Sequence, residues 1–338
     1  MRIKTITQYV ISETNQNSYT TPMSVYSLDD YGRMIADRVR MDAYALALKS
    51  VVKPDSVVLD IGAATGIHAL LACKFGAKKV YAIEPNDAVD LAQEIAQANG
   101  FADRIEFIHD FSTDVTLPQQ ADIIVSDLRG VLPLFSEHIP TILDARQRHL
   151  APGGLLIPQK DTLWAAVVET RVVYNEIIRP WDYPYGLNMN AAKQVMLNRW
   201  VHDDTETIRA LNLLVKPQVW AILDYASIEN PNVSNSPLVL EVTREGTAHG
   251  VLIWFDAQLA DGVSFSNSPY TKKVAEVYGR GFFPFLEPVS VAQGDSITLQ
   301  IQADLVDEEY EWQWHTRIVA KGKTTALKAE FKQSTTYD

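Results

Sequence analysis

The sequence has little cysteine and no long apolar run. Its 338 residues include a single cysteine, Cys73, which excludes an intramolecular disulfide and a metal site built from several cysteines. Because Cys73 lies in the apolar run 69–73, we interpret it as a small core residue rather than a nucleophile. No stretch approaches the roughly 18 uninterrupted apolar residues of a membrane-spanning helix, and the first residues lack the apolar centre of a signal peptide. The sequence therefore predicts a cytoplasmic protein with no membrane partner.

Basic residues are also scarce. Lysine and arginine together number 30 against 42 aspartates and glutamates, which gives a formal net charge of −12. This balance argues against a nucleic acid partner, because a phosphate backbone is bound by basic surfaces. It favours cationic substrates only weakly, since many enzymes are acidic for solubility alone. The composition is otherwise that of an ordinary globular protein, and the length predicts about two domains.

The most informative stretch covers residues 57–66. Apolar residues 57–61 predict a buried strand, and Gly62, Ala64 and Gly66 follow at alternate positions before a helix. Such small residues let a backbone approach a ligand closely, and the N–H groups at the start of a helix favour polar or anionic groups. Glu84 ends the next apolar strand, where a carboxylate can accept both hydroxyls of a ribose. The stretch therefore predicts a nucleotide-cofactor site.

Three interpretations of this turn compete. A nicotinamide or flavin dehydrogenase would carry Gly-x-Gly-x-x-Gly, but the third glycine is absent here and no pyrophosphate cradle is evident. Asp60, Gly62, Gly66 and Glu84 instead resemble the S-adenosylmethionine (SAM) turn of class I methyltransferases, with Ala64 where the middle glycine often stands. The third interpretation is a strand, turn and helix with no ligand.

Strands and helices alternate through the next hundred residues, which predicts an α/β fold with a Rossmann-like, doubly wound parallel sheet. We expect strands at 57–61, 80–84, 105–109, 121–126 and 153–158, and helices at 66–75, 87–99 and 137–150. Ligands of such sheets bind at the carboxyl ends of the strands. The polar residues expected to face one crevice are Asp60, Glu84, His109, Asp110, Ser126 and Asp127.

After Pro158 the pattern changes to short alternating strands, for example 238–243, 251–258, 289–292 and 296–303. We expect three parts: an N-terminal arm and helices over the cofactor (1–50), a SAM-binding Rossmann-like domain (51–158) and an antiparallel β-barrel-like substrate domain (159–338). Residues 1–24 are polar and are predicted to be a flexible arm. Within the last part, a segment of helical spacing at about 172–214 is interpreted as an inserted arm that contacts a second subunit.

This order of parts resembles the protein arginine methyltransferases over roughly residues 26–320. Residues 34–44 resemble the helix before the family's cofactor strand, whose arginine holds the carboxylate of SAM, so the resemblance gives Arg40 that role. Residues 122–130 resemble the family's Ser-Glu-x-x-Gly signature, and Trp181 with 185–189 resembles a motif of its dimerisation arm. The cofactor residues that the resemblance implies are Arg40, Asp60, Gly62, Ala64, Gly66 and Glu84, with Asp110, Thr113 and Asp114 on the adenine side.

The acceptor half departs from the family at three places. Asp127 stands where the first glutamate of the double-glutamate loop belongs, and Ser136 stands at the second, with Glu137 one residue late. A Thr-His-Trp loop is replaced by 268–273, which carries Lys272 and Lys273. Glu137 either supplies the missing carboxylate or stabilises the dipole of the following helix, and both interpretations stay open.

These departures bear on the substrate. Paired carboxylates hold a guanidinium in a fork, and a lysine lining the pocket would repel it. The resemblance implies a SAM-dependent methyltransferase, with S-adenosylhomocysteine as product, acting as a homodimer on a nitrogen or oxygen nucleophile of a protein or peptide, arginine included. Asp127 is the expected catalytic residue, with Glu137 beside it, and no metal is needed. The alternatives are a small-molecule methyltransferase with a rebuilt acceptor site and a non-catalytic SAM-binding scaffold.

Overall fold

The computed structural model describes residues 26–322 and 326–336, so the predicted arm at 1–24 lies outside the described residues. The described chain begins with two helices, α1 (Leu28–Ala36) and α2 (Arg38–Val51). A capping box starts α1, because Ser27 and Asp30 bond to each other's backbone N–H. The carboxylate of Asp37 accepts from the N–H of Arg40 at 3.1 Å and so caps α2. This cap places Arg40 in the first turn of α2.

A parallel sheet of five strands follows in the order β3-β2-β1-β4-β5. Its strands are β1 (Val57–Ile61), β2 (Lys79–Ile83), β3 (Ile105–Ile108), β4 (Ala121–Ser126) and β5 (Leu150–Ile157). Every neighbouring pair is parallel, and α3 (Ile67–Lys74), α4 (Ala88–Ala98) and α5 (His138–Arg148) are the connecting helices. All five residues of β1 are buried, as expected for a strand covered on both faces. The predicted doubly wound α/β sheet is confirmed.

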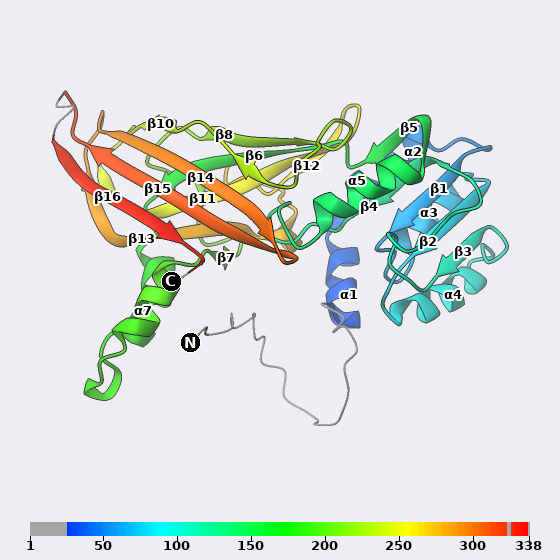
Figure 1. Cartoon of the computed structure of the whole chain (residues 1–338), viewed down its shortest axis with the longest axis horizontal. Coiled ribbons are helices and arrows are strands. Elements are labelled where there is room, and N and C mark those ends of the chain that lie inside the picture. Colours follow the sequence, from blue (N-terminus) through cyan, green and yellow to red (C-terminus); the bar gives the residue numbers. More distant parts are fainter. Residues whose placement is uncertain (1–25, 323–325, 337–338) are drawn as a thin grey trace.

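Two antiparallel sheets make up the remainder (Figure 1). One has the order β7-β13-β11-β6-β8, with β12 beside β11, and the other has the order β10-β14-β15-β16, with β9 beside β14. Their strands are β6 (Lys160–Val168), β7 (Val201–Asp203), β8 (Gln218–Asp224), β9 (Val233–Ser234), β10 (Leu238–Glu241), β11 (Gly246–Ala260), β12 (Val263–Ser266), β13 (Arg280–Val291), β14 (Ser296–Val306), β15 (Glu309–Val319) and β16 (Leu327–Ser334). The predicted antiparallel β part is confirmed.

Aromatic side chains fill the interior of this antiparallel part. Trp312 packs against Phe283 and Trp220 at ring-centroid distances of 5.3 and 5.5 Å, and it exposes only 1% of its surface. Phe283 also meets Trp314 edge to face at 5.3 Å. Such rings bury large apolar areas and prefer tilted or edge-to-face contacts. The core of the β part is therefore built across both antiparallel sheets.

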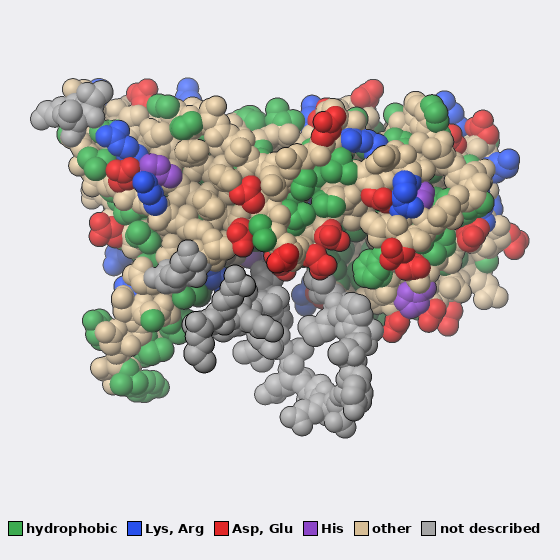
Figure 2. Space-filling view, in the orientation of Figure 1, with side chains coloured by type: hydrophobic (Ala, Val, Ile, Leu, Met, Phe, Trp, Pro, Cys, Tyr) green, Lys and Arg blue, Asp and Glu red, His purple; other side chains and the backbone are tan. Residues whose placement is uncertain are grey.

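A helical insertion projects from the β part (Figure 1). It contains α6 (Arg171–Ile178), the short 3-10 helices η1 (Arg179–Trp181) and η2 (Pro184–Gly186), and α7 (Asn190–Leu197). Two further 3-10 helices, η3 (Ala210–Asn212) and η4 (Glu276–Tyr278), lie in the loops before β8 and β13. Apolar side chains are exposed along the insertion, and Figure 2 shows hydrophobic side chains at its tip. We call this segment, 171–197, the arm.

Helix α2 connects the two parts of the molecule. It contacts α3 next to the parallel sheet and both β11 and β12 of the antiparallel part. Arg40 carries a charge and Tyr44 ends in a polar hydroxyl group, yet both side chains are buried at this junction. In the described part of the chain no helix is long and apolar enough to cross a membrane.

Candidate active site at the junction of the two parts

The turn after β1 has the backbone geometry of a ligand-binding turn. Gly62, Ala64 and Gly66 all have positive φ angles, of 71°, 49° and 81°. The N–H groups of Gly62 and Ala63 both donate to the carbonyl of Ile83, at 2.9 and 3.1 Å, which ties the turn to the end of β2. A Cβ on Gly62 would lie 2.5 Å from the side chain of Leu128. Glycine at 62 is therefore favoured by its φ angle, and a larger residue there would also have to displace the side chain of Leu128.

Glu84 is fixed at the end of β2 by two backbone donors. Its Oε2 accepts from the N–H of Ala64 at 2.7 Å and its Oε1 accepts from the N–H of Asn86 at 2.9 Å. Burial raises the pKa of Glu84 above its usual value, and these two hydrogen bonds partly offset the rise. Each carboxylate oxygen keeps a further lone pair, so the group is an oriented acceptor beside the turn.

Asp60, the fourth residue of β1, is a buried carboxylate with an unused oxygen. Its Oδ2 accepts from the N–H of Ala69 at 2.9 Å, while its Oδ1 has no hydrogen-bond partner among residues 26–322 and 326–336. Burial raises the pKa of Asp60 to about 7 and lowers that of the adjacent His68 to about 3. Because buried polar atoms are normally paired, the free oxygen points to a ligand that supplies a donor or a positive charge.

Asp127 directly follows β4, and its neighbour Ser126 pairs in register with Ile61 of β1. Its Oδ2 accepts from Arg40 Nε and from the hydroxyl of Tyr278, both at 2.6 Å, and Arg40 Nη2 lies 2.6 Å from the same oxygen as an ion-pair contact. Burial would raise the pKa of Asp127, but the guanidinium groups of Arg40 and Arg129 outweigh it and hold that pKa well below its usual range. Asp127 is thus an ionised carboxylate placed beside the turn.

Arg129 is the other partner of Asp127 and exposes none of its side chain. Its Nε donates to Asp127 Oδ1 at 3.1 Å, its Nη1 donates to Asp161 Oδ1 at 2.9 Å, and its Nη2 donates to the hydroxyl of Tyr44. Its guanidinium also lies 5.3 to 5.9 Å from the centroids of four aromatic rings, which are those of Tyr44, Phe255, Phe265 and Tyr278. Carboxylates and aromatic faces both stabilise a buried guanidinium.

The network continues from Asp161 into the interior. Tyr225 donates to Asp161 Oδ2 at 2.6 Å, and His138 Nε2 lies 3.0 Å from the hydroxyl of Tyr225. Burial lowers the pKa of His138 to about 3 and raises that of Tyr225 well above its usual value, so both groups are neutral near pH 7. A polar network thus crosses the junction, with two arginines and two aspartates as its charged members.

Comparison with known proteins assigns the chain to a family. A family model described as the arginine methyltransferase oligomerization subdomain matches residues 159–316, and that of ribosomal protein L11 methyltransferase (PrmA) matches residues 19–177. Protein arginine N-methyltransferase 1 of Chlamydomonas reinhardtii is 31% identical over 257 residues, which cover 72% of this chain and 74% of that protein. The chain belongs to the protein arginine methyltransferase family. The predicted class, a SAM-dependent methyltransferase, is confirmed by this membership.

Other relatives agree. A probable protein arginine N-methyltransferase 6 of Arabidopsis thaliana is 30% identical over 68% of this chain, which spans 54% of that protein's length. Among solved structures, protein arginine methyltransferase 10 of the same plant superposes with a TM-score of 0.78 at 22% identity, covering 91% of this chain and 97% of that one. The PRMT1 enzyme-prozyme complex of Trypanosoma brucei with AdoHcy gives 0.79 at 20% identity, covering 90% and 97%. These two structures share the fold.

The predicted residues fall into two groups when the family pattern is placed on the structure. Arg40 and Asp127 are in direct contact, and Asp60, Gly62, Ala64, Gly66 and Glu84 surround the turn beside them. Asp110, Thr113 and Asp114 follow β3 and are exposed, and Asp110 accepts from the N–H of Phe111. His109 is also exposed, with Nε2 3.1 Å from the carbonyl of Pro85. An adenine contact by the residues after β3 stays a prediction.

The residues predicted for the acceptor side do not all lie at Asp127. Glu137 is exposed at the N-cap of α5, and within the described residues it has no hydrogen bond or ion pair that would join it to Asp127. Its role in the pocket therefore stays a prediction. The next residue, His138, is the one that points inward. Lys272 and Lys273 are both exposed, whereas Tyr278, which was not among the predicted site residues, reaches Asp127.

The sequence pattern did not predict the cluster that Arg129 forms with Asp127, Asp161, Tyr225 and His138. A signal was present, because Asp161 is the second residue of an otherwise largely apolar strand, β6. An acidic residue in such a strand must either be exposed or have a buried cationic partner. The sequence offered no means of identifying that partner.

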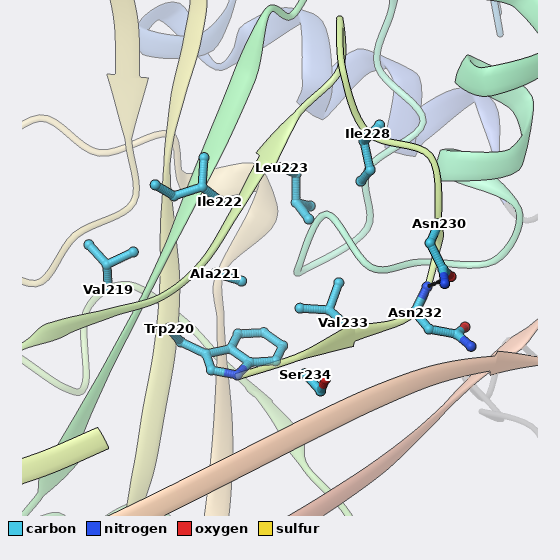
Figure 3. A pocket seen from close by; sticks show the side chains of 10 residues that line it. All are labelled: Val219, Trp220, Ala221, Ile222, Leu223, Ile228, Asn230, Asn232, Val233 and Ser234. Carbon is cyan, nitrogen blue, oxygen red and sulfur yellow. Dashed lines mark hydrogen bonds between the residues drawn. The ribbon is translucent and has the colours of Figure 1, made fainter. Parts of the chain in front are cut away.

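A separate cavity of about 530 Å³ lies in the β part, between β8 and the segment that leads into β9 (Figure 3). Its wall includes Trp220, Ile222, Asn230 and Asn232. None of the residues that line it is titratable or belongs to the network at the junction. The candidate site therefore remains the junction beside the turn after β1.

Proposed function

We propose that the protein transfers the methyl group of SAM to a nitrogen or oxygen nucleophile of a protein or peptide, with Asp127 as the catalytic residue. The observation that carries this proposal is the position of Asp127, an ionised and buried carboxylate directly beside the turn after β1. The side chain of the next residue, Leu128, lies against Gly62 of that turn. The acceptor loop and the cofactor turn are therefore in contact.

The residues around the turn fit SAM. The unpaired Oδ1 of Asp60 suits a cationic ligand, and Glu84 is oriented to accept from ribose hydroxyls. Arg40 is the residue proposed to hold the carboxylate, and the N–H groups at the start of α3 face the same edge of the sheet. When bound, SAM supplies a methyl group on a positively charged sulfur.

Asp127 has two tasks in this proposal. Methyl transfer is an in-line displacement, so the protein chiefly has to hold the nucleophile in line with the methyl group. A carboxylate can orient an N–H or O–H group and stabilise the positive charge that develops on a nitrogen. Because Asp127 exposes only 6% of its side chain, water screens that interaction weakly.

The arm supports a proposal of homodimerisation. Its exposed apolar residues are Val172, Tyr183, Tyr185, Leu187 and Val195. A surface of this kind is typical of a protein interface. The match of residues 159–316 to an oligomerization subdomain points the same way, and the T. brucei relative is described as a heterotetramer. Location in the cytoplasm stays a prediction.

The function is tested by incubating the purified protein with radiolabelled SAM and a lysate of the source cells. We expect label in acid-precipitable protein, and mapping the labelled residue identifies the nucleophile. Label in the small-molecule fraction would favour the alternative of a rebuilt small-molecule site. Absence of label in both fractions, in a protein that binds SAM, would leave only the non-catalytic scaffold.

A further inference from the structure

We infer that Arg129 is an internal guanidinium that occupies the charge-binding part of the acceptor site, so that the acceptor enters as an uncharged nitrogen or oxygen nucleophile. This inference rests on the proposed function, because it concerns the acceptor for which Asp127 is the catalytic residue. It is carried by the contacts of Asp127, the immobility of Arg129 and the charge balance of the cluster.

The carboxylate of Asp127 is already occupied by donors from the protein itself. A carboxylate offers about four lone-pair positions. Arg40 Nε and the hydroxyl of Tyr278 both donate to Oδ2 at 2.6 Å, and Arg129 Nε donates to Oδ1 at 3.1 Å. Both oxygens of this carboxylate therefore already accept hydrogen bonds, and Arg40 Nη2 adds an ion-pair contact to Oδ2. A guanidinium arriving from a substrate finds no free pair of oxygens to bind as a fork.

Arg129 is fixed from every side. Its Nη1 is held by Asp161 and its Nη2 by Tyr44, and its side chain is fully buried. Even if Arg40 turns toward a cofactor carboxylate, Arg129 keeps its bond to Oδ1 of Asp127. Among the described residues, moving Arg129 away would leave the buried carboxylate of Asp161 with one side-chain partner, the neutral hydroxyl of Tyr225.

The charged groups of the cluster balance one another. Arg40 and Arg129 balance Asp127 and Asp161, so the four groups sum to zero. Burial keeps the surrounding tyrosines and histidines neutral near pH 7, because it raises the pKa values of Tyr44, Tyr225 and Tyr278 and lowers those of His68 and His138. Burial also raises the pKa of Asp60 to about 7, and in the proposed function the positive charge of SAM compensates the charge that this carboxyl gains. Ser136 carries no charge, and Glu137 is exposed. A cationic acceptor would lose its hydration here without gaining an uncompensated anion.

The test measures binding of capped amino acids to the full-length protein loaded with S-adenosylhomocysteine. The probes are N-acetylarginine methylamide and N-acetylglutamine methylamide, and ligand-observed NMR gives both dissociation constants. The variant is Arg129→Met with Asp161→Asn, which removes both charges of the buried pair together so that neither is left unpaired. The matched control is Arg244→Met with Glu169→Gln, which removes a half-buried ion pair in the β part.

We expect the unmodified protein and the control to bind the arginine probe no more tightly than the glutamine probe. The double variant should bind the arginine probe about tenfold more tightly than the glutamine probe, since one carboxylate oxygen is released for a charged hydrogen bond. An arginine preference in the unmodified protein would overturn the inference, and so would an unchanged ratio in the double variant. Failure of the proposed function is a separate result, namely no methyl transfer to any component of the lysate, and it leaves these binding ratios unaffected.

Discussion

Arg129 and Asp161 form an ion pair in which neither side chain exposes any surface, with Nη1 and Oδ1 2.9 Å apart. The pair joins the loop after β4 of the parallel sheet to β6 of the antiparallel part. It therefore links the two halves of the protein at the point where the candidate site lies. A buried pair of this kind adds little when compared with apolar residues, but breaking it is costly because one charge is left alone.

The first prediction concerns stability. Arg129→Met alone should lower the free energy of unfolding by about 3–5 kcal/mol, because Asp161 loses its cation. Removing both charges, with Arg129→Met and Asp161→Asn together, should restore part of that loss. Denaturant titration of the four proteins of this cycle gives the coupling. The exposed pair Lys193 and Asp182 is the control. Removing both of its charges should change the free energy of unfolding by about 0–1 kcal/mol. Additive losses at 129 and 161 would contradict the assignment of a coupled pair.

The second prediction concerns pH and SAM binding. Burial raises the pKa of Asp60 to about 7, so in the ligand-free protein this carboxyl is largely protonated at pH 5. A cationic ligand binds the ionised form, which makes binding release a proton below pH 7. The affinity for SAM should therefore rise about tenfold per pH unit as pH increases from 5 toward 7 and then level off. Calorimetric titration across pH 5–8 measures this slope.

The raised pKa of Asp60 also predicts how the stability of the fold depends on pH. Its folded-state pKa lies above the unfolded value, so Asp60 contributes stability that is present below about pH 4 and lost as pH rises through about 7. Asp60→Asn should remove this dependence and flatten the pH profile of SAM affinity. A slope that persists in Asp60→Asn would assign the titration to another group.

The third prediction concerns the ribose contact. Glu84→Gln should weaken SAM binding about 10- to 100-fold, because a hydrogen bond to a charged acceptor contributes about 1.5–3 kcal/mol. Glu94→Gln is the matched control, since Glu94 is exposed on α4 and should leave the dissociation constant unchanged. Fluorescence or calorimetric titration of the unmodified protein and the two variants with SAM measures the three dissociation constants. Equal dissociation constants for all three would remove Glu84 from the cofactor site.

The parallel sheet was accessible from sequence because its strands are short apolar runs with polar ends. The expected strands 57–61 and 121–126 coincide with β1 and β4. The last strand begins at Leu150 rather than at 153, since Pro152 with Gly153 and Gly154 hides an extended segment. The strand β13 was expected only at 289–292 but begins at Arg280. Its early part contains Pro284, which a sequence pattern reads as a break, and which lies opposite an irregularity in β11.

The residues of the candidate site also differ in whether a sequence pattern can find them. The turn after β1 and Glu84 are encoded by local spacing, so a sequence pattern can find them. The surroundings of Arg129 come from positions as distant as Tyr44, Asp161 and Tyr278, and only the packing of α2, β6 and η4 at the junction brings them together. Local periodicity carries no information about such contacts. For this reason the sequence could indicate the turn after β1 and Glu84 but not the contacts of Arg129.

The fourth prediction concerns the arm. Leu187→Glu places a charge among its exposed apolar residues and should shift the protein from dimer to monomer in sedimentation velocity at micromolar concentration, because burying an unpaired charge in an interface is unfavourable. Val239→Glu is the control, an equally exposed apolar residue on β10. Its sedimentation coefficient should match that of the unmodified protein. A Leu187→Glu protein that remains dimeric would place the interface elsewhere.

The fifth prediction concerns Asp127, which has to be separated from its structural role. Asp127→Asn keeps the shape but removes the charge that orients the nucleophile, and methyl transfer should fall by about 100-fold or more. Because Arg40 and Arg129 then lose an anion, stability should also fall, so the thermal midpoint and the affinity for S-adenosylhomocysteine are measured on the same sample.

Asp122→Asn is the control for this experiment, because Asp122 lies on the same strand and accepts only from the N–H of Val57 among the described residues. Its methyl transfer should be close to that of the unmodified protein. If Asp127→Asn binds the product normally, stays folded at the assay temperature and still transfers methyl groups at the full rate, then Asp127 only neutralises its two arginines. In that case the nucleophile must be oriented by another group, of which Glu137 is the remaining candidate that the sequence predicted.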